Sequence, residues 1–243
     1  MKKPLEGKVA LITGGASPIG RATAAALTAA GARVALHYRS SKEIAERAAK
    51  ELGGIALRGS LPKDADKIVA ETVRRLGRLD ILVNNASHIE ASGWTEDLEK
   101  LDLDMWRRAF EADVLGTFTC SRAAARAMKK RGGKIITIGS IPALVGDRDG
   151  IIYATAKAAI VGMSKSLALL WAPRIQVNCM ALGSIETAWT KWLTPKKKAS
   201  YKSAIPMGRF GRPDEVADLA LFLASHDWVT GQTFVLDGGE TRC

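Results

Sequence analysis

The segment Val9-Ala-Leu-Ile-Thr-Gly-Gly-Ala-Ser-Pro-Ile-Gly20 decides the fold class of this chain. Its first part, 9–13, is a short apolar run that predicts a buried strand, and an alanine-rich stretch at 19–30 predicts a helix. Glycines between the two let the backbone turn sharply, so that free N–H groups at the helix start can face a pyrophosphate. The residues expected to form this phosphate turn are Gly14, Ser17, Pro18 and Ile19.

The alternation of a short apolar run with a longer helical pattern continues along the 243 residues. The apolar runs are continuous, as expected for strands of a parallel sheet that helices cover on both faces. We therefore predict an α/β fold with one domain over 1–243, a doubly wound parallel sheet of about seven strands with helices on both faces. The predicted strands are 9–13, 33–37, 55–57, 80–83, 134–138, 174–179 and 233–236, and the predicted helices are 19–30, 42–52, 63–76, 104–131, 152–171 and 214–224.

Composition and charge exclude several classes of protein. With 47% hydrophobic residues, the chain is too apolar for a disordered segment. The net charge of +11 is spread along the chain, and outside 184–205 the basic residues are not interleaved with aromatic residues, so we expect no nucleic-acid partner. The three cysteines and three histidines show no metal-ligand spacing, and no apolar stretch is long enough to span a membrane. We expect a cytoplasmic protein with no metal site and no membrane partner.

The residues that follow the second predicted strand indicate the type of dinucleotide. A carboxylate at the end of this strand would bind a ribose 2′-hydroxyl, whereas an arginine suits a 2′-phosphate. The sequence here is His37-Tyr-Arg-Ser-Ser41, and the first carboxylate comes later, at Glu43. We therefore predict that Tyr38, Arg39 and Ser40 bind the adenosine end of the cofactor and favour NADP(H) over NAD(H).

Tyr153 and Lys157 are four residues apart at the start of a predicted helix and therefore share one face. A tyrosine has an ordinary pKa of about 10, too high for proton transfer at neutral pH, and a nearby ammonium favours the ionised phenol. Ser140 follows the fifth predicted strand, and its hydroxyl can hold a substrate carbonyl or alkoxide. Tyr38 and Lys42 have the same spacing, but no serine precedes them, so we assign the acid–base role to Tyr153.

Further motifs follow along the chain. Together with the glycine turn, Ser140 and the Tyr153–Lys157 pair, they make the chain resemble the short-chain dehydrogenase/reductase family over essentially its full length. The resemblance implies a Rossmann fold, a nicotinamide cofactor and usually a homotetramer. It implies that Tyr153 is the general acid/base, that Lys157 assists it, and that Ser140 orients the substrate carbonyl. The segments that carry it are 13–20, Leu79-Asp-Ile-Leu-Val-Asn-Asn-Ala86, Gly139-Ser140, 153–157, Val177-Asn178, Leu182-Gly183, 208–217 and Asp237-Gly-Gly239.

The resemblance also implies cofactor contacts outside the glycine turn. Tyr153 and Lys157 would lie at the nicotinamide end, where the lysine binds ribose hydroxyls. Ser60 stands at a position where the family often has an aspartate that contacts adenine. Together with Ser60, the residues implied to contact the cofactor here are Leu61, Asn85, Ala86, Gly183, Ile185 and Thr187.

The chain departs from the family pattern close to the predicted catalytic residues. Asp113 stands where the family usually has an asparagine that holds a proton-relay water, and Ser87 stands where it has a glycine. A carboxylate near Lys157 would raise the pKa of that lysine, and its field would disfavour the phenolate of Tyr153. We therefore count Asp113 among the predicted catalytic residues. The alternative is a structural role, in which Asp113 caps a local helix distortion and points away.

Segment 184–205 follows the sixth predicted strand, where family members fold a substrate lid. Its tryptophans, Trp189 and Trp192, can line an apolar pocket or pack against the domain. Its lysines either form a solvated face or attract a phosphate-bearing carrier such as an acyl thioester. These lysines are Lys191, Lys196, Lys197, Lys198 and Lys202.

The resemblance predicts an NADP(H)-dependent oxidoreductase that transfers a hydride between the nicotinamide and a carbonyl/alcohol pair. Segments 136–140 and 207–211 resemble 3-oxoacyl-carrier-protein reductases, which favours a 3-oxoacyl thioester as substrate. Segments 84–87 and 37–41 resemble pteridine reductases, and sugar or polyol oxidation is a further alternative. The alternative from another class is a non-catalytic sensor or scaffold that binds NADP(H).

Overall fold

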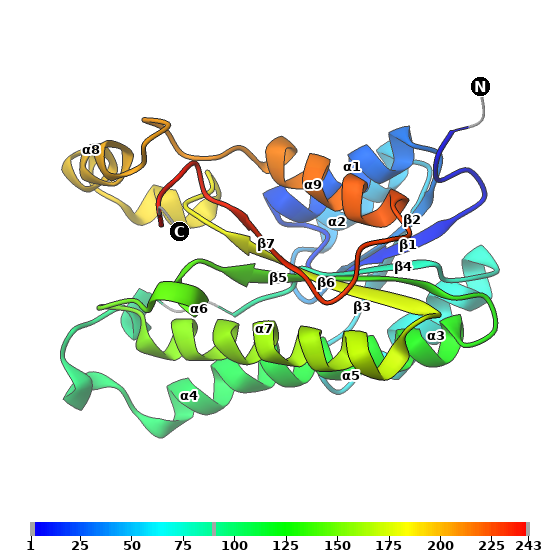
Figure 1. The fold of residues 1–243 in the computed structure, drawn as a ribbon, viewed down its shortest axis with the longest axis horizontal. Helices are drawn as coiled ribbons and strands as arrows, with labels where there is room; N and C mark the ends of the chain where they lie inside the picture. The colour runs from blue at the N-terminus through cyan, green and yellow to red at the C-terminus, as the bar shows by residue number, and fades with distance from the viewer. Residues whose placement is uncertain (1–2, 89–90, 242–243) are drawn as a thin grey trace.

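The computed structural model describes residues 3–88 and 91–241, and it contains one parallel sheet (Figure 1). The strand order is β3-β2-β1-β4-β5-β6-β7, and every neighbouring pair is parallel. The predicted doubly wound sheet of seven strands is therefore confirmed. The strands are β1 (Val9–Ile12), β2 (Arg33–Tyr38), β3 (Ile55–Arg58), β4 (Ile81–Asn84), β5 (Gly133–Ser140), β6 (Ile175–Leu182) and β7 (Thr233–Leu236).

Helices cover both faces of the sheet because successive strand residues point to opposite sides. Ala10 and Ile12 of β1 pack with α1, α2 and α9, whereas Val9 and Leu11 pack with α3, α5 and α7. Figure 1 shows these two layers above and below the sheet. The helices are α1 (Pro18–Ala29), α2 (Lys42–Glu51), α3 (Ala65–Leu76), α5 (Gly116–Met128), α7 (Ile151–Trp171) and α9 (Pro213–Ser225).

The long helix predicted at 104–131 is present as one uninterrupted helical stretch over 103–128, but it is not α-helical throughout. The structure has α4 (Leu103–Ala109), then a π-helical segment, η3 (Phe110–Leu115), and then α5. A π-helical turn adds a residue to the helical repeat and is frequent at functional sites. Here it contains the buried Asp113, whose carboxylate faces α7. A tertiary contact thus accompanies the π-helical turn.

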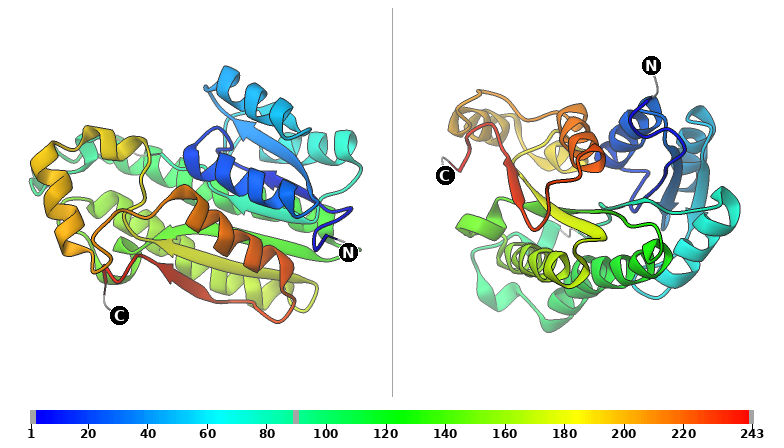
Figure 2. Two further views of the ribbon diagram at one scale, coloured as in Figure 1. Left: turned by 90° about the horizontal axis from the view of Figure 1, so that it is seen from above. Right: turned by 45° about the vertical axis from the view of Figure 1, so that its right-hand side comes forward.

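The predicted lid segment, 184–205, folds into two short elements, η4 (Ala188–Trp192) and α8 (Pro195–Ala204). Both views in Figure 2 show this segment at one end of the sheet. The short helix α6 (Pro142–Val145) directly follows β5. The turns η1 (Ala91–Gly93) and η2 (Leu98–Lys100) lie between β4 and α4. This end, where the parallel strands finish, is where open α/β sheets bind ligands.

We find no helix within 3–88 and 91–241 that is both long and apolar enough to cross a membrane.

Candidate active site

The glycine turn between β1 and α1 is closely packed. Gly14 has a φ of +62°, which favours glycine, and a Cβ on Gly20 would lie 2.5 Å from the Gly14 carbonyl oxygen. Ser17 caps α1 by accepting a hydrogen bond of 3.1 Å from the Gly20 N–H. Pro18 takes the first helical position, where its missing N–H would have no helical partner, and Ile19 packs against the core. The turn therefore presents the start of α1 at the carboxyl end of β1.

Asn85 and Thr13 hold this turn in place. The Asn85 side-chain amide donates to the carbonyl oxygens of Thr13 and Gly14 at 2.9 and 3.0 Å. The Thr13 hydroxyl accepts the backbone N–H groups of Asn85 and Ala86, each at 3.0 Å. Asn85 thus shapes the turn through its side chain, in addition to any contact that it makes with a cofactor.

His37 contacts the glycine turn through its ring, a role that the sequence did not reveal. Its Nδ1 accepts the Gly14 N–H at 3.4 Å, and its Nε2 lies 3.2 Å from the Gly59 carbonyl oxygen. Burial lowers the pKa of His37, because it disfavours the charged imidazole. The neutral ring, with its proton on Nε2, satisfies both contacts and links the ends of β2 and β3 to the glycine turn.

The residues predicted for the adenosine end meet at the carboxyl ends of β2 and β3. Tyr38 is buried, whereas Arg39 and Ser40 are exposed. The Ser60 backbone N–H donates to Asp64 at 2.7 Å, and Leu61 is half-buried beside it. Arg39 is therefore accessible to a ligand at this edge of the sheet.

Tyr153 and Lys157 lie on α7, next to the end of β5. The Lys157 Nζ is 5.4 Å from the centre of the Tyr153 ring and donates to the Ile138 carbonyl oxygen at 3.2 Å. Ser140 ends β5, and its hydroxyl donates to the Leu182 carbonyl oxygen at 3.2 Å. Tyr38, which has the same spacing to a lysine, lies on β2, and β1 and β4 separate that strand from β5. The two tyrosines therefore occupy different parts of the sheet edge.

Asp113 faces Lys157, as the first of the two sequence interpretations expects, and its catalytic role stays a prediction. The two charged groups are 3.1 Å apart and almost completely buried, with side chains 1% and 3% exposed. Burial, the largest single influence, would lower the pKa of Lys157. The charge of Asp113, its hydrogen bond to the lysine and the nearby Tyr153 and Cys179 together outweigh burial, and the pKa lies above its ordinary value. Lys157 is therefore protonated at rest at neutral pH.

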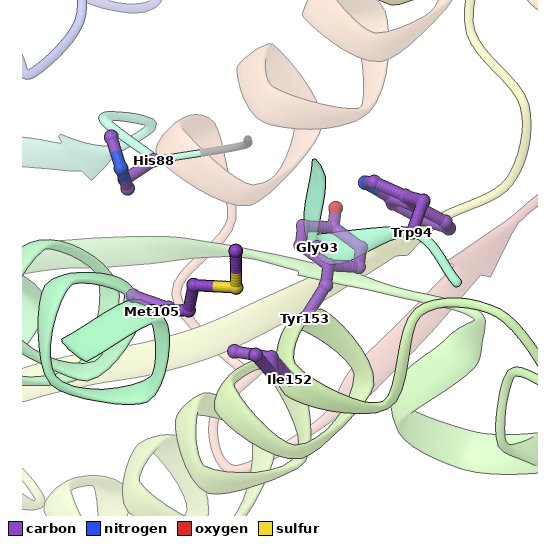
Figure 3. Close-up of a pocket in the computed structure, with 7 residues that line it drawn as sticks. His88, Gly93, Trp94, Met105, Ile152 and Tyr153 are labelled. Atoms are coloured by element: carbon purple, nitrogen blue, oxygen red, sulfur yellow. The ribbon is translucent and has the colours of Figure 1, made fainter. Parts of the chain in front are cut away.

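A small cavity opens beside Tyr153 (Figure 3). Figure 3 shows Trp94 next to Tyr153, with Met105 and His88 across the cavity. The ring centres of Trp94 and Tyr153 are 5.5 Å apart. A Cβ on Gly150 would lie 2.7 Å from the Trp94 ring, so the glycine makes room for this wall. Trp94 was not among the predicted site residues.

The lid tryptophans do not line this cavity. Trp189 donates to the Ile185 carbonyl oxygen at 2.8 Å and packs edge-on against Tyr201 and Phe210. Trp192 is 56% exposed. Of the two roles open for these tryptophans, Trp189 therefore takes the packing role.

The remaining predicted cofactor residues follow β6. Gly183 lets the C-terminal loop approach, since a Cβ there would lie 2.6 Å from the Cβ of Asp237. Ile185 is buried, and Thr187 is half-buried at the start of η4. They lie after the carboxyl end of β6, at the same edge of the sheet as Ser140.

Comparisons with known proteins agree with this arrangement. A family model described as Enoyl-(Acyl carrier protein) reductase matches residues 14–241. A 3-oxoacyl-[acyl-carrier-protein] reductase FabG from Salmonella typhimurium is 39% identical, with 96% of this chain and 97% of the relative covered. The chain belongs to the short-chain dehydrogenase/reductase family. Another FabG, from Thermotoga maritima, is 38% identical, with 97% of this chain and 98% of the relative covered. A short-chain dehydrogenase/reductase from Serratia marcescens has a TM-score of 0.88 and 34% identity, over 98% of this chain and 99% of that chain.

As a short-chain dehydrogenase/reductase, the chain is an oxidoreductase that acts on CH–OH and ketone groups with a nicotinamide cofactor. Its residues fit such a cofactor. The turn at Gly14 and Gly20 has no room for side chains, so a pyrophosphate can approach the backbone closely. Arg39 is exposed at the predicted adenosine end, and Lys157 is buried next to β5, on the other side of β1 and β4.

Proposed function

We propose that this chain reduces the keto group of a 3-oxoacyl thioester, or a similar ketone, with NADP(H). The observation that carries the proposal is the buried cation of Lys157 beside Tyr153, next to the strand end that holds Ser140. The relatives named 3-oxoacyl-[acyl-carrier-protein] reductase, which align along nearly the whole chain, support the choice of substrate.

Each side chain has a distinct task in this mechanism. The bound nicotinamide supplies the hydride for the carbonyl carbon. Tyr153 donates its phenolic proton to the carbonyl oxygen as negative charge develops there. Lys157 stabilises the resulting phenolate, because a fixed cation favours the ionised form of a neighbouring phenol. Ser140 orients the carbonyl with its hydroxyl, after leaving the Leu182 oxygen that it contacts here.

Cofactor choice tests the role of Arg39. A charge-assisted contact between its guanidinium and a 2′-phosphate contributes roughly 1.5–3 kcal/mol, so NADPH should bind about tenfold or more tightly than NADH. The double variant Tyr38→Asp/Arg39→Ala should reverse this order, because a carboxylate binds a 2′-hydroxyl and repels a phosphate. Fluorescence titration with both cofactors measures the two dissociation constants.

The matched control for this experiment is Arg21→Ala, which removes an exposed arginine on the first turn of α1, outside the adenosine end. It should leave the preference for NADPH in place. Tighter binding of NADH than NADPH by the unmodified chain would refute the role of Arg39.

Asp113 is expected to set the pH dependence of alcohol oxidation. Oxidation requires the Tyr153 phenolate, and the Asp113–Lys157 pair beside it carries no net charge. Asp113→Asn leaves the pair with the charge of Lys157 alone, which favours the phenolate. The pH at which oxidation reaches half its maximal rate should therefore move downward, and activity should not be abolished. A pH–rate profile that overlays the wild-type profile would leave Asp113 a structural residue.

The lid fits a carrier-linked substrate. Its lysines on α8 are exposed or half-exposed, and the Lys202 Nζ lies 5.6 Å from the centre of the Phe210 ring. A basic lid attracts the phosphate of an acyl carrier by long-range electrostatics. We include a homotetramer in the proposal, because Leu169 and Leu170 on α7 are 85% and 70% exposed and are suited to a subunit contact.

A panel of carbonyl compounds with both cofactors tests the proposed function as a whole. Oxidation of NADPH should be fastest with 3-oxoacyl thioesters and slower with pteridines and sugar ketones. Tight binding of NADPH without its oxidation by any carbonyl would instead indicate a sensor or scaffold.

A further inference from the structure

Two departures from the family pattern meet in the structure. The Ser87 hydroxyl donates to Asp113 Oδ2 at 2.6 Å, and the backbone N–H of His88 donates to Oδ1 at 2.7 Å. The oxygen that accepts from Ser87 is the same one that contacts the Lys157 Nζ. The loop after β4 and the π-helical turn η3 therefore hold one carboxylate between a buried ammonium and a hydroxyl.

These groups form a continuous chain of donors and acceptors from the interior to the surface. Lys157 is 2% exposed and Asp113 is 1% exposed, whereas Ser87 is exposed. The two links, Lys157 Nζ to Asp113 Oδ2 and Asp113 Oδ2 to Ser87 Oγ, measure 3.1 and 2.6 Å. Both are within hydrogen-bond distance, so a proton can pass along them without any water between the side chains.

We propose that Lys157, Asp113 and Ser87 form a side-chain proton path that returns a proton from solvent to the catalytic tyrosine after each reduction, with Ser87 as its outer end. This inference rests on the proposed ketone reduction. Ser87 then positions the carboxylate of Asp113 and relays protons to it. Asp113 passes protons on to Lys157, in addition to keeping Lys157 protonated at rest.

When the O–H bond of Tyr153 breaks, its proton goes to the substrate alkoxide and leaves a phenolate. An N–H bond of Lys157 then breaks and restores the phenol. The neutral amine takes a proton through Asp113 Oδ2, which receives one from the Ser87 hydroxyl as that hydroxyl takes a proton from solvent. Each group ends the cycle in its starting state, and one proton is consumed per ketone reduced, as the overall reaction requires.

Ser87→Ala tests this path because it removes the outer hydroxyl, and Ser87 does not line the cavity beside Tyr153. The first turnover uses the proton already on Tyr153, so its rate, followed by stopped-flow NADPH absorbance with acetoacetyl-N-acetylcysteamine, should change less than about twofold. Later turnovers need a returned proton, and the steady-state rate should fall about tenfold. The trace should therefore show a burst of one NADPH per site.

Two further measurements separate a relay from a merely structural contact. Ser87→Thr keeps a hydroxyl at the same position and should restore the steady-state rate. Imidazole, as a small proton donor, should accelerate the later turnovers of Ser87→Ala and leave the wild-type rate unchanged. A structural defect would slow the first turnover as well and would not respond to imidazole.

Several results would overturn the proposal. A steady-state rate of Ser87→Ala equal to that of the wild type would show that Tyr153, which is half-buried, regains its proton directly from solvent. Equal loss in the first and later turnovers would reduce Ser87 to a packing role. If the wild type did not oxidise NADPH with the thioester at all, the proposed function would fail instead, so the two failures are distinguishable.

Discussion

Replacing Tyr153 with phenylalanine is expected to lower kcat for ketone reduction at least ~100-fold. The variant keeps the ring that packs beside Trp94 and removes only the hydroxyl that delivers the proton. Because Lys157 and the glycine turn are untouched, NADPH affinity should stay within a few-fold of wild type. Steady-state kinetics with a 3-oxoacyl thioester and a cofactor titration measure the two effects separately.

The chain contains its own control for this experiment. Tyr38 also precedes a lysine by four residues, but it ends β2, and Lys42 forms an exposed ion pair with Glu46 at 3.9 Å. Tyr38→Phe should therefore leave the chemical step nearly intact. Equal losses of kcat in the two variants would contradict the assignment of Tyr153 as the acid.

The parts of the site that could be predicted from the sequence are those set by local geometry. The glycine turn needs a strand, a tight turn and a helix start in consecutive residues, and 9–20 provides all three. The shared face of Tyr153 and Lys157 follows from the helical repeat of α7. The position of Ser140 at a strand end follows from the parallel sheet, where carboxyl ends meet at one edge.

The parts that could not be predicted depend on contacts between residues distant in sequence. Residues 110–115 have a pattern compatible with a regular helix, and the π-helical turn appears where Asp113 meets Lys157, 44 positions later. His37 was given no role because its partner groups, Gly14 and Gly59, are backbone atoms of other segments. Ser87 was noted only as a replaced glycine, since its partner lies 26 residues away.

Trp94 was missed for a different reason. No spacing or motif distinguishes it from the other five tryptophans of the chain. Its place beside Tyr153 depends on the loop before α7, where the Thr95 N–H donates to the Asp149 carbonyl oxygen at 2.7 Å and Gly150 leaves room for the ring. The lid tryptophans lie in the segment predicted to cover the substrate, among lysines, but Trp189 packs against Tyr201 and Phe210.

The buried Asp113–Lys157 pair gives the second large expected effect, on stability. Lys157→Met leaves the carboxylate of Asp113 in a dry environment with its cation removed. Breaking a buried pair in this way costs roughly 3–5 kcal/mol, because an uncompensated charge stays buried. The free energy of unfolding, measured by urea denaturation at neutral pH, should fall by about this amount.

The double variant Lys157→Met/Asp113→Asn should recover most of that loss. Its neutral amide can still accept from Ser87 or His88, and no buried charge remains without a partner. The exposed pair of Arg148 and Glu96, with a separation of 2.7 Å, is the matched control. Because water screens exposed pairs, Arg148→Met should cost at most about 1 kcal/mol. A double variant as unstable as Lys157→Met alone would show that Lys157 stabilises the fold through its packing and its contact with Ile138, rather than through the charge of Asp113.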